Sequence, residues 1–196
     1  MQKSPRKRAL FCTWSDIVRI DYKKLTIRNA EAADAGQLAS WWNDGAVMAH
    51  AGYPLGLGIS EEKIISDLST DTDESRRRLI LEIEGEAVGE MSYRNLKDGS
   101  AEIGIKICNS SRQEKGHGRV FLSMLIGELF ERGYEKIVLD TNLQNKRAQH
   151  VYESLGFRKL RVNIDSWKDQ LGNPIAAGGH VTDAIGETYT LTAQWV

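Results

Sequence analysis

The sequence predicts a single domain of mixed α/β (α+β) class. Its sheet is expected to be mixed but mostly antiparallel, with about seven strands and about four flanking helices. Three observations carry this prediction. Short runs that alternate apolar and polar residues are interleaved with stretches whose apolar residues recur at helical spacing. Three β-rich runs in the middle of the chain are separated by turn signals, and one wholly apolar run lies between two amphipathic stretches.

The first elements lie between residues 25 and 68. Leu25–Arg28 alternates apolar and polar residues, as a half-buried strand does, and Glu31–Asn43 carries a helical apolar stripe. Gly52–Gly58 is too rich in glycine and proline to extend that helix. Ser60 then precedes acidic residues in the way an N-cap does, which predicts a second helix ending near Leu68.

Three antiparallel strands are expected next. Arg78–Glu84 and Ala87–Arg94 are separated by Gly85-Glu86, and Ala101–Cys108 follows the turn signal Asp98-Gly99. In the third run isoleucines alternate with polar residues, so one face is predicted to be buried and the other polar. The polar face has a side-chain gap at its glycine.

Two helices and a buried strand follow. Apolar residues recur at helical spacing over Val120–Leu129, and Gly133 supplies the C-terminal stop. Ile137–Leu139 is short, apolar and bounded by charges, as is typical of a strand buried on both faces. Ala148–Leu155 again shows a helical apolar face, which Gly156 ends.

The C-terminal part is expected to add strands at Phe157–Trp167 and at Thr188–Trp195, the second of which would close the sheet. Lys168–Glu187 is glycine-rich and is interpreted as a functional loop or an ordered flap. We therefore expect an N-terminal extension at residues 1–24, with no assigned role, and one domain at residues 25–196.

Composition excludes several classes of function. The sequence has 26 Lys and Arg residues and 27 Asp and Glu residues, so its net charge is close to zero. The protein as a whole is therefore not expected to attract nucleic acid or an anionic membrane electrostatically. Cys12 and Cys108 are far apart and belong to no metal-ligand spacing, so neither a metal site nor a disulfide scaffold is expected. The basic N-terminus lacks the apolar run of a signal peptide, and no stretch approaches a membrane span. These features favour the cytoplasm, and pairing of the C-terminal strand could form a homodimer.

The most informative stretch is a glycine loop between a predicted strand and a predicted helix. Backbone amides at a helix N-terminus bind anions, because their unpaired N–H groups and the positive end of the helix dipole point the same way. Glycines let phosphate oxygens approach, while cationic neighbours add charge. The candidate phosphate-binding residues are Gln113, Lys115, Gly116, His117, Gly118 and Arg119.

This loop resembles the Q/R-x-x-G-x-G/A signature of the GNAT acetyltransferase superfamily, matched by Gln113, Gly116 and Gly118. A second stretch, Asn145–Ala148 followed by Val151–Phe157, resembles the family segment N-x-x-A…Y-x-x-x-G-F. Leu-Thr-Ile-Arg at residues 25–28, Trp-Asn-Asp at 42–44 and Ala-Glu-Ile-Gly at 101–104 are similar to the branch that contains ribosomal-protein N-terminal acetyltransferases and some aminoglycoside acetyltransferases.

The resemblance implies a single domain whose sheet is splayed at a coenzyme cleft, with acetyl-CoA as cosubstrate and no metal. Amides near Ile105 and Ile107 would pair with the pantetheine arm and hold the acetyl carbonyl. Amides of the glycine loop would bind the pyrophosphate, while Asn145 and Tyr152 would lie beside the thioester. The reaction would be acetyl transfer to a primary amine by direct attack.

Two catalytic residues are predicted on this basis. Tyr152 is the candidate general acid for the departing sulfur, although on helix spacing alone it could be a core tyrosine. Glu102 is the candidate base, with Glu90 as a second strand carboxylate. Both glutamates could instead be cross-strand partners of Arg94 and Lys106.

Other functions remain open in the sequence. A dinucleotide-binding oxidoreductase is favoured by Asp140, which follows the glycines at the distance of a ribose-binding acid, but Phe121 occupies the third-glycine position. A non-catalytic acyl-CoA sensor is a further alternative. The acceptor could be a protein N-terminus, an aminoglycoside or a small metabolite, recognised by Trp42–Ile59 and Lys168–Glu187.

Overall fold

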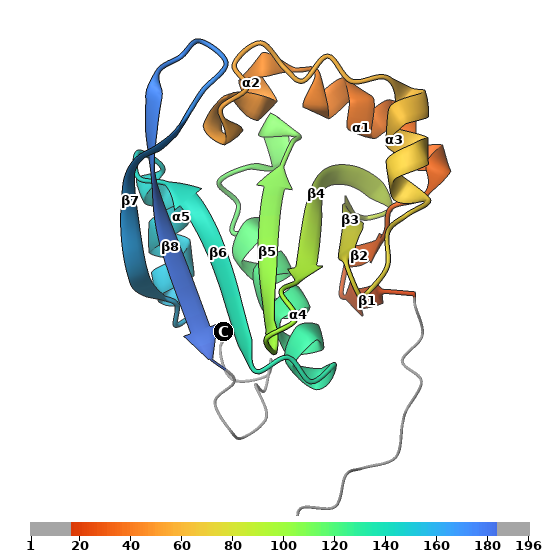
Figure 1. Ribbon diagram of the computed structural model, residues 1–196. Coiled ribbons are helices and arrows are strands. Elements are labelled where there is room, and N and C mark those ends of the chain that lie inside the picture. Colours follow the sequence, from red (N-terminus) through yellow and green to blue (C-terminus); the bar gives the residue numbers. More distant parts are fainter. Residues whose placement is uncertain (1–16, 184–196) are drawn as a thin grey trace, which may run out of the picture.

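The structure is a computed structural model that describes residues 17–183, except for the side chains of 163–167, 176–179, 181 and 183. Within this range, eight strands form one open sheet in the order β1-β2-β3-β4-β5-β6-β8-β7. All neighbouring pairs are antiparallel except β5 and β6. Helices α1, α2 and α3 lie across one end in the view of Figure 1, and α4 and α5 lie behind the sheet.

The strands are β1 (Arg19–Tyr22), β2 (Leu25–Asn29), β3 (Arg76–Ile83), β4 (Glu86–Asn95), β5 (Ser100–Ile107), β6 (Lys136–Asn142), β7 (Arg158–Lys168) and β8 (Pro174–Asp183). The α-helices are α1 (Ala35–Trp42), α2 (Gly45–Met48), α3 (Glu61–Leu68), α4 (His117–Glu131) and α5 (Lys146–Ser154). Short 3-10 helices occupy Ala32–Asp34, Ala49–Ala51, named η2, and Ser110–Arg112.

The two faces of the sheet bury different helices because strand side chains alternate. Leu79 and Leu81 of β3 point into the large core that α4 covers, whereas Ile80 points into a second core with α1 and α3. All three side chains are fully buried. Each such burial is worth about 1.5–3 kcal/mol, so the alternation in β3 holds helices on both faces.

The helices and strands expected between residues 25 and 156 are confirmed. Ser60 caps α3 by accepting a hydrogen bond from the Lys63 amide, and α3 ends at Leu68 as expected. Gly133 and Gly156, which follow α4 and α5, have positive φ angles of 92° and 87°. These are left-handed conformations that favour glycine, which is why the helices end there.

Two regions differ from the expectation. Arg19–Tyr22, within the segment expected to be an extension, forms the edge strand β1 and pairs with β2. Pro174–Asp183, interpreted as part of a loop or flap, is the strand β8, which pairs with both β6 and β7. The strand expected at Thr188–Trp195 lies outside the described residues.

The parallel contact between β5 and β6 is short. Register pairs join Ser100–Glu102 to Lys136–Val138 and extend no further. Beyond Glu102, β5 stays paired with β4, and β6 stays paired with β8 as far as Asn142. The two strands therefore separate after Glu102, as the resemblance implied.

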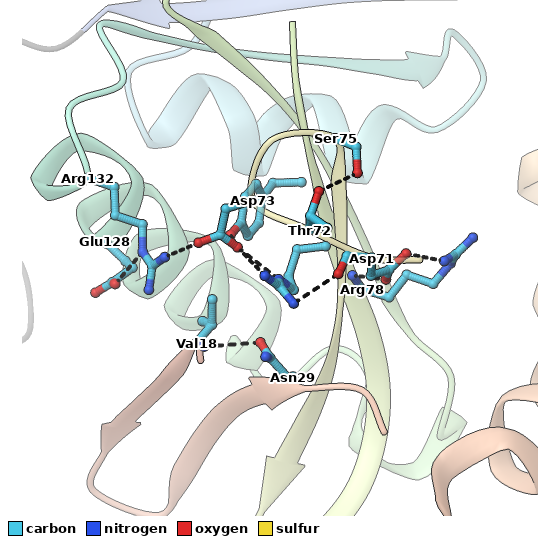
Figure 2. Close-up of polar contacts among 11 residues, drawn as sticks. Val18, Asn29, Asp71, Thr72, Asp73, Ser75, Arg78, Glu128 and Arg132 are labelled. Carbon is cyan, nitrogen blue, oxygen red and sulfur yellow. Dashed lines mark hydrogen bonds and ion pairs between the residues drawn. The ribbon is translucent and has the colours of Figure 1, made fainter. Parts of the chain in front are cut away.

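A polar network holds the C-terminal end of α4 against the loop that precedes β3 (Figure 2). Asp73 accepts hydrogen bonds from Arg77, from the Tyr93 hydroxyl at 2.7 Å and from Arg132 at 2.8 Å. Removing one partner from a buried ion pair costs about 3–5 kcal/mol, because it leaves an uncompensated charge. The network thus orients α4, whose other end is the glycine loop.

Among residues 17–183, no helix combines the length and the apolar content needed to cross a membrane.

Candidate active site

A cavity of about 1180 Å³ opens where β5 and β6 separate. Its wall comes from β5 and β6, from the N-terminal ends of α4 and α5, and from α2 and η2. Of the predicted site residues, the cavity wall includes Glu102, Ile105, Ile107, Gln113, Gly116, His117, Gly118, Arg119, Asn145 and Tyr152. Lys115 is exposed and is not part of the wall.

A smaller cavity of about 500 Å³ lies beside Tyr93, Arg132 and Tyr134. On its wall, Tyr93 and Arg132 donate hydrogen bonds to Asp73, the centre of the network in Figure 2, and Lys97 forms an ion pair with Glu74. The larger cavity, in contrast, contains donor groups that have no acceptor among the described residues. The larger cavity is therefore the candidate active site.

The glycine loop presents free backbone donors to the larger cavity. Gly116 is the N-cap of α4 with a φ angle of 78°, a left-handed conformation that favours glycine. The amides of Arg119 and Val120 donate to the Gly116 carbonyl. Within residues 17–183 the amides of His117 and Gly118 have no acceptor, so they are available to an anion.

One side-chain donor is also left over. Arg119 Nε is buried and has no hydrogen-bond partner in the described part of the chain. A buried donor without an acceptor costs about 1–3 kcal/mol, so an oxyanion at this position would recover that cost. Together with the free amides, Arg119 makes this end of the cavity suitable for a diphosphate.

The loop is tied to the end of β5. Gln113 Nε2 donates to the Ile107 carbonyl at 2.8 Å, and His117 Nδ1 lies 3.3 Å from the Arg112 carbonyl oxygen. The Gln113 side chain therefore holds the loop in place. Arg147 of α5 forms an ion pair with Glu114 at 2.8 Å, which connects the loop to the opposite wall.

The second predicted motif forms the first turns of α5. Asn145 is the N-cap, and its Oδ1 accepts from the Ala148 amide at 3.1 Å. Tyr152 lies two turns further along, is 8% exposed, and packs against the rings of Phe157 and His180 at centroid distances of 5.9 and 5.8 Å. Its hydroxyl has no hydrogen-bond partner among the described residues. Burial raises the pKa of Tyr152 to about 12, so the hydroxyl keeps its proton at neutral pH.

The two candidate glutamates are engaged by cross-strand partners. Glu102 lies opposite Arg94 and accepts from Arg94 Nε at 2.8 Å. Glu90 lies opposite Lys106, with an Nζ–Oε1 distance of 3.2 Å. The alternative of cross-strand ion pairs is therefore confirmed. Glu102 lines the cavity, whereas Glu90 is not part of its wall.

The cysteine in the described range is not an activated nucleophile. Cys108 follows β5 and is 7% exposed. Burial, helped by the negative charge of Glu90, raises the pKa of its thiol to about 12. The thiol is therefore protonated at neutral pH, which does not favour a cysteine-bound acyl intermediate.

The far end of the cavity is formed by α2 and η2, through Ala46, Val47, His50 and Ala51. The turn between β7 and β8 closes against the segment that follows η2, as Figure 1 shows for the hairpin beside α2. Gln170 makes this contact. Its Nε2 donates to the Gly56 carbonyl at 2.7 Å, its Oε1 accepts from the Leu55 amide at 2.9 Å, and its own amide donates to the Gly52 carbonyl.

Sequence reasoning missed Gln170, because its partners lie about 115 positions away and no local signal connects them. We expect Gln170→Ala to raise the KM of the acceptor about three- to tenfold while leaving the Kd of CoA unchanged. The two lost hydrogen bonds hold the segment that follows η2, next to the far end of the cavity and away from the glycine loop. Steady-state kinetics and calorimetry measure the two quantities. Asn173→Ala, which removes a bond within the same turn, is the matched control. An unchanged KM in Gln170→Ala would contradict the expectation.

The geometry bears on the oxidoreductase alternative. Phe121, at the position of a third dinucleotide-binding glycine, is fully buried in the core, and the strand before the loop has antiparallel and short parallel neighbours. Neither feature fits the oxidoreductase alternative. Within residues 17–183, no group of three or more His, Cys, Asp or Glu side chains could hold a metal ion.

Comparisons with solved structures give the same fold. A spermidine N-acetyltransferase from Vibrio cholerae, in complex with CoA and spermine, is 21% identical with a TM-score of 0.72, over 82% of this chain and 95% of that chain. A ribosomal-protein-alanine N-acetyltransferase from Brucella melitensis is 23% identical with a TM-score of 0.69, over 80% and 98% of the two chains. A putative acetyltransferase from Salmonella typhimurium with its cofactor acetyl-CoA is 22% identical with a TM-score of 0.69, over 84% and 96%.

No curated protein matches the sequence. The family comparison is nevertheless decisive, because the acetyltransferase (GNAT) domain matches residues 24–158, which is more than half of the chain. This range contains β2 to β6, the glycine loop and α5. The chain therefore belongs to the GNAT family of acetyl-CoA-dependent acetyltransferases.

Proposed function

We infer that the protein transfers the acetyl group of acetyl-CoA to a primary amine by direct attack within the cavity between β5 and β6. The observation that carries this inference is the single continuous cavity that joins free loop amides at one end to the α2 and η2 segment at the other. One end suits a diphosphate, and the other is open to a second substrate. The cytoplasm, as expected from the sequence, is the proposed location.

The residues fit the coenzyme. The free amides of His117 and Gly118 and the unpartnered Arg119 Nε would hold the diphosphate. Among residues 17–183, the β5 edge at Ile105 and Ile107 has no neighbouring strand on the β6 side, so backbone amides there can pair with an extended arm. Acetyl-CoA supplies the activated thioester.

The protein's own groups would then act on the transfer. A β5 amide near Ile105 donates to the carbonyl oxygen as negative charge develops there. The amine nitrogen forms the new C–N bond while the C–S bond breaks, and Tyr152 gives its proton to the departing sulfur. The proton lost by the amine leaves to solvent, and Tyr152 is reprotonated from solvent.

The role of a base is small for some acceptors. An alkylamine with a pKa near ~10 must lose a proton at a cost of about 4 kcal/mol at neutral pH, whereas an α-amino group near ~8 costs about 1 kcal/mol. Glu102, whose carboxylate is already held by Arg94, would act at most through water. We therefore propose that Glu102 chiefly positions neighbouring groups.

The pH profile follows from these ionisations. We expect kcat/KM for an alkylamine to rise about tenfold per pH unit until the amine is neutral near pH ~10, with no falling limb in that range. Tyr152 loses its proton only as the pH approaches its raised pKa of about 12, so the acid form persists across this range. Initial rates in overlapping buffers measure the profile. A falling limb below about pH 9 would show that another group donates the proton.

The decisive test of the proposed function combines two measurements. Calorimetry with CoA should show binding, and thiol release from acetyl-CoA should depend on the amine across a panel of peptides, aminoglycosides and small amines. Binding without thiol release for every amine would favour the alternative of an acyl-CoA sensor. Size-exclusion chromatography with light scattering would test the proposed homodimer.

A further inference from the structure

Arg76, the first residue of β3, lines the cavity and differs from the neighbouring arginines in its ion pairing. The other arginines of β3 and β4 each bind a carboxylate: Arg77 binds Asp73, Arg78 binds Asp71, and Arg94 binds Glu102. Arg76 has no ion pair and no side-chain hydrogen bond within residues 17–183. Its side chain is exposed, and it interacts electrostatically with Asp71, whose carboxylate already binds Arg78. Within residues 17–183, Arg76 is therefore a cation of the cavity wall that no carboxylate binds directly.

The position of Arg76 carries a cost for the fold. It lies directly opposite Arg94 in the β3–β4 register, and Arg94 lies opposite Glu102 in the β4–β5 register. Like charges directly opposite each other destabilise a sheet. Glu102 reduces this cost by binding Arg94, but Arg76, Arg94 and Glu102 together still have a net positive charge. An anion beside Arg76 would neutralise this charge.

The remaining charges at this end of the cavity are also cationic or already paired. Lys106 lines the cavity, and its Nζ lies 3.2 Å from Glu90 Oε1 and 2.8 Å from Met48 Sδ. Glu102 supplies the carboxylate in this part of the cavity wall, and it forms an ion pair with Arg94. Among described residues, no carboxylate in this part of the wall is free to bind a second ammonium group.

The floor between Arg76 and the thioester end is open. Gly104 lies between Glu102 and Lys106 on the same face of β5, and a Cβ added there would meet only Ser92 Oγ, at 3.6 Å. Arg76 lies two strands away from Glu102, and Ile105 lies three residues beyond Glu102 along β5. At ordinary strand spacings, the Cα atoms of Arg76 and Ile105 are therefore roughly 14 Å apart. A ligand lying over Gly104 could span part of this distance.

We propose that the acceptor is an amine bearing a carboxylate several bonds from its amino group, and that Arg76 binds this carboxylate. The proposal rests on the proposed acetyl transfer and adds the class of acceptor. The carboxylate compensates Arg76 and fixes one end of the acceptor. The amino group then extends over Gly104 towards the thioester. Polyamines lack the group that Arg76 needs and add positive charge to a cationic chamber.

The test compares ω-amino acids of increasing chain length with their amides and with diamines of matched length. Thiol release at saturating acetyl-CoA gives kcat/KM for each acceptor. We expect the best ω-amino acid to exceed its amide by about tenfold, the order of one charge-assisted hydrogen bond. Arg76→Gln should bring this ratio close to one, and Arg76→Glu should favour the diamine.

Two controls separate recognition from folding and from net charge. Arg76→Gln should keep or raise the thermal midpoint, because it removes the like-charge pair with Arg94. Arg19→Gln, which removes an exposed arginine of β1, should leave the ratio unchanged. This proposal is overturned if the wild-type enzyme acetylates amides or diamines with a kcat/KM equal to that for ω-amino acids. An unchanged ratio in Arg76→Gln also overturns it. Either result leaves acetyl transfer intact. Failure to acetylate any amine despite CoA binding overturns both proposals.

Discussion

A Gly118→Asp variant is expected to lose at least about a hundredfold in CoA affinity, or about 2.8 kcal/mol, while its free energy of unfolding stays the same or rises. The affinity falls because a carboxylate on the first turn of α4 would occupy the free amides and repel a diphosphate. The stability rises because an acidic side chain in the first turn interacts favourably with the helix dipole, by about 0.3–1 kcal/mol. Calorimetry and denaturant unfolding measure the two effects, which have opposite signs.

Gly118→Ala is the matched control for this substitution. A Cβ at Gly118 has ordinary clearance, with Ile107 Cγ1 the nearest atom at 4.0 Å, so both variants should fold. Alanine also removes the cost of a glycine in a helix, and by more than aspartate does, but it adds no charge. We expect it to bind CoA within a few-fold of the wild type. If the aspartate variant bound CoA as well as the alanine variant does, the diphosphate could not lie at the N-terminus of α4.

Tyr152→Phe is expected to lower kcat by about a hundredfold, at the low end of what a positioned general acid contributes. The ring contacts with Phe157 and His180 are kept, and the hydroxyl that is lost has no partner in the described part of the protein. Stability and CoA affinity should therefore change little, because no buried hydrogen bond is broken. Steady-state kinetics and CoA titration separate the effect on turnover from the effect on binding.

Tyr134→Phe provides the comparison for Tyr152→Phe. Tyr134 is a half-buried tyrosine whose ring packs on Tyr93 at a centroid distance of 6.4 Å, outside the larger cavity. Its variant should retain full turnover. Unchanged kcat in Tyr152→Phe would remove the hydroxyl from the mechanism and leave Tyr152 as a core residue, the alternative that helix spacing suggests.

Much of the fold could be predicted because local signals coincide with tertiary structure in this chain. Ser60, Gly133 and Gly156 mark helix ends by backbone chemistry alone. The strand β8 could not be predicted in this way, since glycines at 178 and 179 lower its intrinsic β-propensity. Its hydrogen bonds to β6 on one side and β7 on the other outweigh that propensity.

The candidate site shows the same division. The glycine loop and the start of α5 are contiguous motifs, so sequence alone located Gly116, Gly118 and Tyr152 as candidates. The partners of Glu102 and Glu90 could be stated only as alternatives, because they depend on the register of neighbouring strands. Arg76 gave no signal at all, since an unpaired arginine is recognised only when every neighbouring carboxylate has been placed.

The amino-acid sequence by itself therefore determined most helices and strands between residues 25 and 156 and which loop could bind a phosphate, because caps, turns and apolar periodicity act over a few residues. Tertiary structure alone decided that β5 separates from β6 after Glu102, that Gln170 joins the β7–β8 turn to the segment after η2, and that Arg76 lies in the cavity wall with no ion pair among residues 17–183. These features join residues that are distant in the chain, and strand register and side-chain packing fix them only once the whole sheet has formed.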